Sequence, residues 1–139
     1  MPKLELDAAV SRQVEAGLDV MKAFKDNQML RPTVIFALGT NGVIDSDMLR
    51  QLGEGYPEYR IYLVSIVQPD ADVEKRVNTV IRQAADQYDN LFLIDWYDFA
   101  KTQRDIFYND GTHPNASGAA VYAQYLAKHV AAGEITAAL

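Results

Sequence analysis

Apolar and polar residues along the chain follow two alternating patterns. Largely apolar runs at Thr33–Leu38, Arg60–Val67 and Asn90–Asp95 indicate strands that are covered on both faces, which is typical of a parallel sheet. The shorter run Lys3–Leu6 alternates polar and apolar residues and favours an edge strand. We therefore expect four strands, with the most apolar run, Thr33–Leu38, near the centre of the sheet.

Helical spacing of apolar residues separates the strand candidates. Two predicted helices each place their apolar residues on a single face. These faces are formed by Val10, Val14, Leu18 and Met21, and by Val73, Val77, Val80, Ala84 and Tyr88. Strands that alternate with helices in this way predict βαβ units, and hence an α/β fold with a mostly parallel sheet.

Capping residues mark two further helices. A short helix begins at Asp45 or Ser46, whose side chains can accept hydrogen bonds from backbone amides, and we expect it to end at Gly53. The last helix begins after a cap formed by Asn115 or Ser117. We expect the residues after Gly133 to form a frayed tail.

The composition excludes several classes of protein. The 139 residues predict one domain, residues 1–139, and 49% hydrophobic with 23% charged residues are typical of a globular protein. A formal charge of −6 without a basic cluster argues against a nucleic-acid partner. The absence of cysteine excludes disulfides and thiol nucleophiles. No apolar run approaches the roughly 20 residues that cross a bilayer, and no signal-type segment occurs.

Two kinds of residue that often mark metal or catalytic sites have structural interpretations here. The acidic pairs Asp45/Asp47 and Asp70/Asp72 lie at predicted helix starts, where capping explains them, so we expect no metal. His129 lies in the last turns of a helix near Tyr125, where we interpret it as structural.

Candidate chemistry lies in loops that follow strands, because functional groups of parallel sheets gather at the carboxyl ends of the strands. The sequence Gly39-Thr40-Asn41-Gly42 directly follows the strongest strand candidate. The Asn41 side-chain amide could donate a hydrogen bond to a developing oxyanion. The alternative is a simple Asn-Gly turn, and the residues alone leave both interpretations open.

A second candidate loop is Asp110-Gly111-Thr112-His113-Pro114. Within such a short segment, Asp110 could accept a hydrogen bond from one ring nitrogen of His113 and direct the other nitrogen toward a nucleophile. The alternative is that Asp110 and Gly111 form a turn and that His113 merely precedes the last helix. This pattern, too, leaves both interpretations open.

Together these loops resemble a known superfamily. The sequences GTNG, after a buried strand, and DGTHPN, before the last helix, resemble the third and fifth blocks of the SGNH (GDSL-like) hydrolases. A longer resemblance is to the extracytoplasmic domain of bacterial membrane acyltransferases that O-acetylate peptidoglycan and other envelope glycans. It covers nearly the whole chain and includes residues 7–13, 34–42, 95–97 and 110–115.

The resemblance implies a fold, a reaction and a set of roles. The fold would be a three-layer α/β/α sandwich, SGNH- or flavodoxin-like, and the reaction would be acyl transfer through a Ser-His-Asp triad without a cofactor. His113 would be the general base and Asp110 its orienting carboxylate. Asn41 and Gly39 would stabilise the oxyanion or bind substrate, together with Ser11, which stands where many relatives carry the block-two glycine. The domain would lie outside the cytoplasm and act on an acetylated glycan or another acyl ester.

One departure from the family concerns the nucleophile. The family's serine lies in a Gly-Asp-Ser block after its first strand, and no Gly-Asp-Ser occurs in this sequence. None of the serines lies in a sharp strand-to-helix turn of the nucleophile kind. The serines are Ser11, Ser46, Ser65 and Ser117. We therefore expect a domain that is N-terminally truncated relative to the family, lacks its first strand and has negligible turnover in isolation.

The missing first strand has consequences for partners. Its neighbours in the sheet would need new partners, through direct pairing, through a strand of another copy in a homo-oligomer, or through disorder of the N-terminus. The partner that completes the domain would be the missing N-terminal segment or the membrane domain of a parent protein. The alternatives are a non-catalytic α/β module that binds a glycan or a partner, and a flavodoxin-like fold with no inherited site, in which loops 39–42 and 110–115 would lie far apart.

Overall fold

The computed structural model describes residues 5–9, 12–41 and 44–138, with only the backbone for 134–138. Its described strands form one parallel sheet in the order β1 (Thr33–Phe36), β2 (Arg60–Val64) and β3 (Leu91–Ile94). In the register, Val34 lies opposite Ile61, which in turn lies opposite Leu91. The expected α/β fold with a parallel sheet is confirmed.

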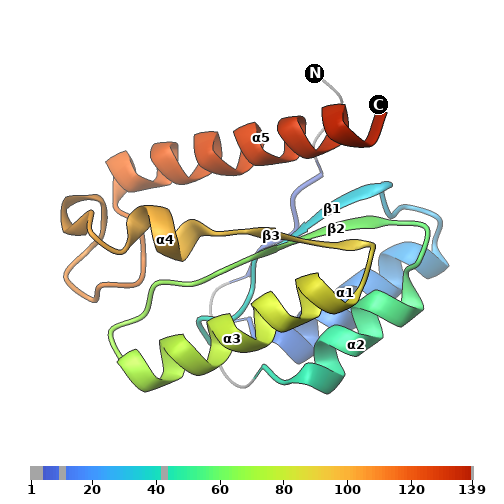
Figure 1. Ribbon diagram of the computed structural model, residues 1–139, viewed down its shortest axis with the longest axis horizontal. Coiled ribbons are helices and arrows are strands. Elements are labelled where there is room, and N and C mark those ends of the chain that lie inside the picture. Colours follow the sequence, from blue (N-terminus) through green and yellow to red (C-terminus); the bar gives the residue numbers. More distant parts are fainter. Residues whose placement is uncertain (1–4, 10–11, 42–43, 139) are drawn as a thin grey trace.

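Helices cover both faces of the sheet and complete a three-layer sandwich (Figure 1). One face carries α1 (Val14–Asp26), α2 (Ser46–Gly55) and α3 (Ala71–Gln87). The other face carries α5 (Ala116–Ala138), while the short helix α4 (Trp96–Ala100) and the 3-10 turn η1 (Arg104–Ile106) lie between β3 and α5 in the chain. Each layer of helices closes its own apolar core against the sheet.

Among the described strands, the most apolar run does not take the central position that we expected. β1 lies at an edge of the described sheet, and β2 is central. Four of the five residues of β2 are buried, whereas Ile35 in β1 is 37% exposed. A continuous apolar run shows that the faces of a strand pack against helices, but it does not specify the strand's place in the sheet order. Phe36 packs on the α1 side, as expected of a strand that helices cover.

The strand boundaries are also shorter than expected, and the fourth strand is not formed by its described residues. β1 ends at Phe36 rather than Leu38, and β2 ends at Val64 rather than Val67. Of the run Lys3–Leu6, the first two residues lie outside the described residues, and Glu5 and Leu6 belong to no strand. Leu6 is 83% exposed, so it lacks the packing that stabilises an alternating edge strand.

Two glycines expected to end helices lie inside them. The helix α2 continues through Gly53 to Gly55, and α5 continues through Gly133 to Ala138. A methyl group at residue 53 would overlap the ring of Tyr88, and one at residue 133 would overlap the Tyr62 hydroxyl. Both glycines therefore allow close approach of an aromatic side chain rather than a left-handed helix end.

The predicted caps are largely as expected. Asp45 caps α2 by accepting a hydrogen bond from Met48 N at 2.9 Å, and Asp70 caps α3 by accepting from Asp72 N and Val73 N.

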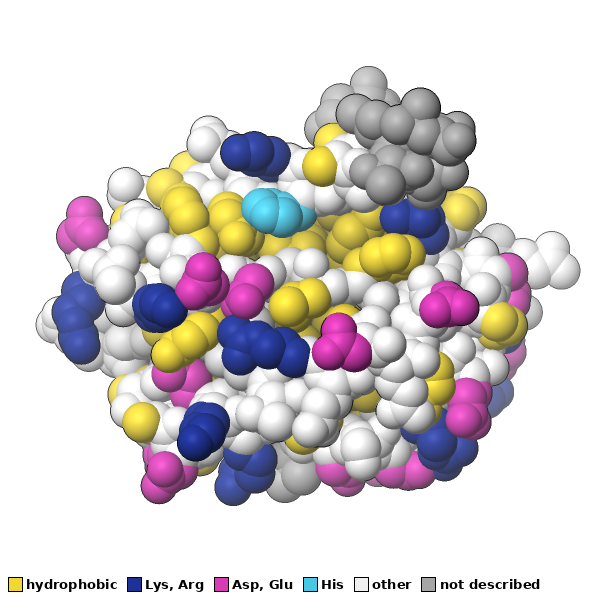
Figure 2. Space-filling view, in the orientation of Figure 1, with side chains coloured by type: hydrophobic (Ala, Val, Ile, Leu, Met, Phe, Trp, Pro, Cys, Tyr) yellow, Lys and Arg dark blue, Asp and Glu magenta, His cyan; other side chains and the backbone are white. Residues whose placement is uncertain are grey.

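On the surface, Figure 2 shows hydrophobic side chains gathered in a band beneath α5, with charged side chains of both signs around it. No helix within the described ranges is long and apolar enough to cross a membrane.

Candidate active site

The turn that precedes α5 holds the imidazole of His113 against the carboxylate of Asp110. His113 Nδ1 lies 2.7 Å from Asp110 Oδ2. The second oxygen, Oδ1, accepts hydrogen bonds from the backbone N–H groups of Thr112 at 2.9 Å and of His113 at 3.0 Å. Asp110 thus orients both the ring and the backbone of the turn. Because Nδ1 is engaged, Nε2 is the ring nitrogen that can exchange a proton with a substrate or nucleophile.

Asn115 and the backbone fix this turn on the domain. Tyr108 N donates to the carbonyl oxygen of His113 at 2.9 Å. Asn115 Nδ2 donates to the carbonyl oxygen of Asp105 at 2.7 Å, while its Oδ1 accepts from Gly118 N at 2.9 Å. Of the two expected caps for the last helix, Asn115 is the one whose side chain accepts this bond. The same side chain therefore starts α5 and closes the loop that carries His113.

Hydrogen bonds lower the pKa of Asp110 to about 2. The largest causes are the backbone N–H groups of Thr112 and His113, followed by the side chain of His113. Each of these donors stabilises the charged carboxylate. Asp110 therefore stays negative at any ordinary pH and can stabilise a protonated ring at residue 113.

In the variant His113→Ala, we expect the pKa of Asp110 to stay below its ordinary value of about 3.9. The two largest causes are backbone donors, which alanine retains. A titration of the Asp110 side-chain carboxyl followed by ¹³C NMR, with the wild type in parallel, measures this. Because the pKa is lowered in the folded state, the stabilisation is present above about pH 4 and is lost as the pH falls toward 2. If the pKa of Asp110 rose to about 3.9 in the variant, the dominant role of the backbone donors would be contradicted.

A cleft of about 150 Å³ lies between this turn and the carboxyl ends of β1 and β2. The turn contributes Thr112, His113 and Pro114, and the loop after β1 contributes Gly39 and Thr40. The two loops that sequence analysis singled out, which are far apart in the chain, thus line one cleft. This arrangement argues against a flavodoxin-like fold with no inherited site, which would have separated them.

The residues expected to stabilise the oxyanion do not all line the cleft. Gly39 has φ +146°, a backbone conformation that favours glycine, and it lines the cleft. Asn41 is half-buried and follows Thr40, but it does not itself line the cleft. Ser11 lies outside the described residues. Of this group, the structure brings Gly39 alone into the cleft with His113.

Two aromatic residues form the apolar wall of the cleft. Trp96 is 4% exposed, and its ring contacts the Tyr122 ring edge-to-face with centroids 4.8 Å apart. Burial raises the pKa of Tyr122 to about 12, so its hydroxyl stays neutral. The wall is therefore apolar and uncharged beside the His113 ring, a surface that suits the methyl end of a short acyl group.

Sequence analysis missed a polar network behind this wall. Ser65 lies just beyond β2, is 1% exposed and lines the cleft. Its hydroxyl donates to Asp95 Oδ1 at 2.9 Å and accepts from Tyr97 N at 2.9 Å. Arg82 donates to both oxygens of Asp95, at 3.1 and 3.2 Å. The signal that could have revealed the network is the lone serine in the largely apolar run 61–67.

None of the described serines is hydrogen-bonded to the His113 ring. Ser65 is committed to Asp95 and Tyr97, Ser46 is the first residue of α2, and Ser117 is an exposed residue in the first turn of α5. Within the described segments, the recorded partner of the His113 ring is Asp110. The cleft thus contains an imidazole held by a carboxylate, without an aligned serine from the described residues.

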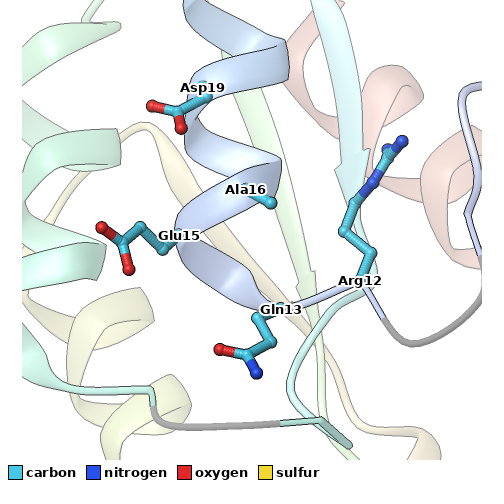
Figure 3. A pocket seen from close by; sticks show the side chains of 5 residues that line it. All are labelled: Arg12, Gln13, Glu15, Ala16 and Asp19. Atoms are coloured by element: carbon cyan, nitrogen blue, oxygen red, sulfur yellow. The ribbon is translucent and has the colours of Figure 1, made fainter.

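A second hollow of about 330 Å³ lies beside α1 and is lined by Arg12, Gln13, Glu15, Ala16 and Asp19 (Figure 3). Glu15 and Asp19 point to one side of the helix, whereas Arg12 points to the other. Because these side chains do not converge, the hollow lacks the arrangement of a site. Across the segments that the structure describes, no group of three His, Asp or Glu residues could hold a metal ion.

The chain is similar to bacterial peptidoglycan-modifying proteins. It is 33% identical over 129 residues to O-acetyltransferase OatA of Staphylococcus aureus, and 31% identical over 126 residues to peptidoglycan O-acetyltransferase OatA of Listeria monocytogenes. These alignments cover 92% and 91% of this chain but only 21% and 20% of the relatives. The chain thus spans about a fifth of the length of the curated relatives it matches. No family model matches it.

A solved structure shares its fold. The C-terminal catalytic domain of peptidoglycan O-acetyltransferase A from Streptococcus pneumoniae, determined with a methylsulfonyl adduct, superimposes with a TM-score of 0.85. The match has 21% sequence identity and covers 96% of this chain and 83% of the solved domain.

Proposed function

This chain is a homologue of the C-terminal domain of peptidoglycan O-acetyltransferase OatA with an SGNH-like fold, and on that premise we propose that its cleft carries out O-acetyl chemistry on cell-envelope glycans. The observation that carries the proposal is the hydrogen bond between His113 and Asp110 at a cleft shared with Gly39. The site would work outside the cytoplasm, on the face of the membrane where peptidoglycan lies, as one part of a larger acyltransferase.

In the proposed reaction, a serine oxygen attacks the carbonyl carbon of an acetyl ester, and His113 Nε2 takes the serine proton. Asp110 holds the ring by accepting from Nδ1–H and stabilises the positive charge that forms. The Asn41 amide and the Gly39 N–H donate to the oxyanion. When the tetrahedral intermediate collapses, the leaving alcohol receives the proton, and a sugar hydroxyl or water then removes the acetyl group from the serine by the reverse sequence.

The size of the cleft supports a small acyl group. Its volume of about 150 Å³ lies below the roughly 300–1,000 Å³ of pockets that enclose a drug-sized ligand. His113 is 67% exposed and Asp110 is 50% exposed. An acetyl group would therefore enter beside Trp96 and Tyr122, while the glycan would remain on the surface.

The attacking serine would come from residues outside this chain. The described serines support this part of the proposal, because the Ser65 hydroxyl is bonded to Asp95 and Tyr97 and no described serine is bonded to the His113 ring. The segment that carries the serine would present its hydroxyl to His113 Nε2.

We expect the 139-residue chain alone to hydrolyse acetyl esters at least about 10³-fold more slowly than an intact domain of this kind. It should also gain no mass from a serine-reactive phosphonate, because none of the described serines is hydrogen-bonded to the His113 ring. Both are measured on the purified chain, by ester hydrolysis and by mass spectrometry. Stoichiometric labelling, or a rate equal to that of an intact domain, would contradict the proposal that the serine comes from elsewhere.

A chimera tests the chemistry itself. The Gly-Asp-Ser block of an intact relative, placed before this chain, should restore hydrolysis, and His113→Ala within the chimera should abolish it. The matched control is His129→Ala, which removes a histidine whose Nδ1 lies 2.8 Å from the carbonyl oxygen of Tyr125. A folded chimera without esterase activity would overturn the proposed function.

A further inference from the structure

Asn78 is a fully buried polar residue on the sheet-facing side of α3. It is 2% exposed, and its neighbours on that face are the apolar side chains of Val77 and Ile81. Its Oδ1 accepts from Ile66 N at 2.8 Å, and its Nδ2 donates to the Ile66 carbonyl oxygen at 2.9 Å. A buried amide is destabilising unless its groups are paired, and here both ends are used on one residue.

These two bonds fix the chain just beyond the end of β2. The strand ends at Val64, and Ser65 N still donates to the carbonyl oxygen of Ile94 at 3.1 Å. At Ile66 the Asn78 side chain supplies both a donor and an acceptor, as a neighbouring strand would. Ser65 and Ile66 both line the cleft, so the amide of Asn78 holds a segment of the cleft wall.

The side chain of Ile66 extends this constraint to the Gly39 loop. A Cβ atom at Gly39 would lie 3.3 Å from Ile66 Cγ2 and 3.3 Å from Val77 Cγ1, which is tighter than most real Cβ contacts. Gly39 therefore packs close to these two side chains. Any displacement of Ile66 must move the start of the loop that continues through Thr40 to Asn41, because packed interiors transmit small shifts.

We propose that Asn78 is a positioning residue for the Gly39–Asn41 loop, acting through the backbone and Cγ2 of Ile66. The placement of the loop stands on these contacts alone. Its chemical consequence, the alignment of oxyanion donors opposite His113, rests on the proposed function. Asn78 itself does not line the cleft and touches no substrate in this scheme.

The variant Asn78→Asp tests the positioning. A protonated carboxyl can still accept from Ile66 N and donate to the Ile66 carbonyl oxygen, whereas an ionised one cannot donate. We expect the backbone amide NMR signals of Gly39, Thr40 and Asn41 to match the wild type at low pH and to move away from it as the carboxyl ionises. Spectra of the wild type at each pH correct for the native carboxylates beside Ile66, which are Glu74, bonded to Gln68 N, and Asp95, bonded to the Ser65 hydroxyl.

The matched control is Asn90→Ala. Asn90 Nδ2 donates to the carbonyl oxygen of Tyr56 at 2.8 Å, just before β3 and thus at the opposite end of the sheet. This variant also loses an asparagine-to-backbone bond, but it should shift the Gly39–Asn41 amides several-fold less than ionised Asn78→Asp. Equal shifts in both variants, or no pH-dependent recovery in Asn78→Asp, would overturn the positioning role.

A second pair of variants decides the question if Asn78→Asp unfolds when it ionises. Ile66→Val keeps the Cγ2 atom that contacts Gly39, whereas Ile66→Ala removes it. We expect the loop signals to move in Ile66→Ala and to stay in place in Ile66→Val, and the reverse or equal shifts would overturn the proposal. If the loop moves but a catalytically competent chimera keeps its full rate, the positioning holds and the oxyanion role of Asn41 fails.

Discussion

Replacing Gly118 by alanine is expected to lower the free energy of unfolding by about 3 kcal/mol, at the upper end of the usual range for overpacking. A methyl group at residue 118 would overlap the backbone carbonyl oxygen of Ile106. That oxygen already accepts a hydrogen bond from Asn115 N at 2.9 Å. Because the obstacle is backbone in the η1 turn rather than the end of a flexible side chain, α5 itself would have to shift.

The measurement is urea unfolding of the wild type and the variant. Gly55→Ala is the matched control, because Gly55 also lies in a helix and a Cβ placed there meets nothing within 4 Å beyond its chain neighbours and its own helix backbone. The control should leave stability unchanged or raise it by up to about 1 kcal/mol through the helix propensity of alanine. If Gly118→Ala behaves like Gly55→Ala, the close contact between α5 and η1 is wrong.

Replacing Asp95 by alanine is expected to lower the free energy of unfolding by roughly 2–3 kcal/mol, the range for hydrogen bonds to a charged group. The carboxylate accepts from the Ser65 hydroxyl, from Asp98 N at the start of α4 and from Arg82. Without it, the Ser65 hydroxyl loses its acceptor in a position that is 1% exposed. The variant thus leaves a buried polar group with one fewer partner and removes the cap of α4.

The pH dependence of Asp95 follows from its surroundings. Partial burial raises its pKa, but the hydrogen bonds from Ser65, Asp98 N and Arg82 together outweigh burial and lower the pKa below its ordinary value. Because the folded pKa is lowered, the stabilisation is present above about pH 4, the unfolded value, and is lost as the pH falls through the folded value. The difference in stability between wild type and Asp95→Ala should therefore narrow in acid.

Asp98→Ala is the control for Asp95→Ala. Asp98 lies three residues away and pairs with Lys101 at 2.8 Å, but its side chain is 70% exposed. Its removal should change stability by less than about 1 kcal/mol, as for other surface ion pairs. The double variant Ser65→Ala/Asp95→Ala should be less destabilised than the sum of the single variants, because the two side chains share one bond. Additive effects would show that the network does not act as a unit.

The order of helices and strands was predictable because each element needs its own apolar face. The faces of α1 and α3 repeat at helical spacing, and the apolar runs of β1, β2 and β3 match parallel strands covered on both sides. The sheet order was not predictable in the same way. An edge strand between two layers of helices has the same faces as a central one, and the order of strands is set by backbone hydrogen bonds, which every residue except proline can form on both sides.

The candidate site was also predictable only in part. Asp110 and His113 could be paired from the sequence because three residues separate them and a turn brings them together. Ser65 and Asn78 could not be assigned partners, because Asp95 and Ile66 meet them only after α3 packs on the sheet. A polar residue within an apolar face, as Asn78 is within α3, indicates that some buried backbone group needs a partner, but it does not indicate which one.

Because Asp110 and His113 lie on one tight turn, the geometry between their side chains is local. The bonds that align Asp110 with His113 span no more than three residues, whereas the cleft they face depends on packing between distant segments. Gentle heating or mild denaturant should therefore loosen the cleft before it parts the two side chains. Such a turn is a local structural unit, which evolution could retain or transfer intact while the fold around it changed.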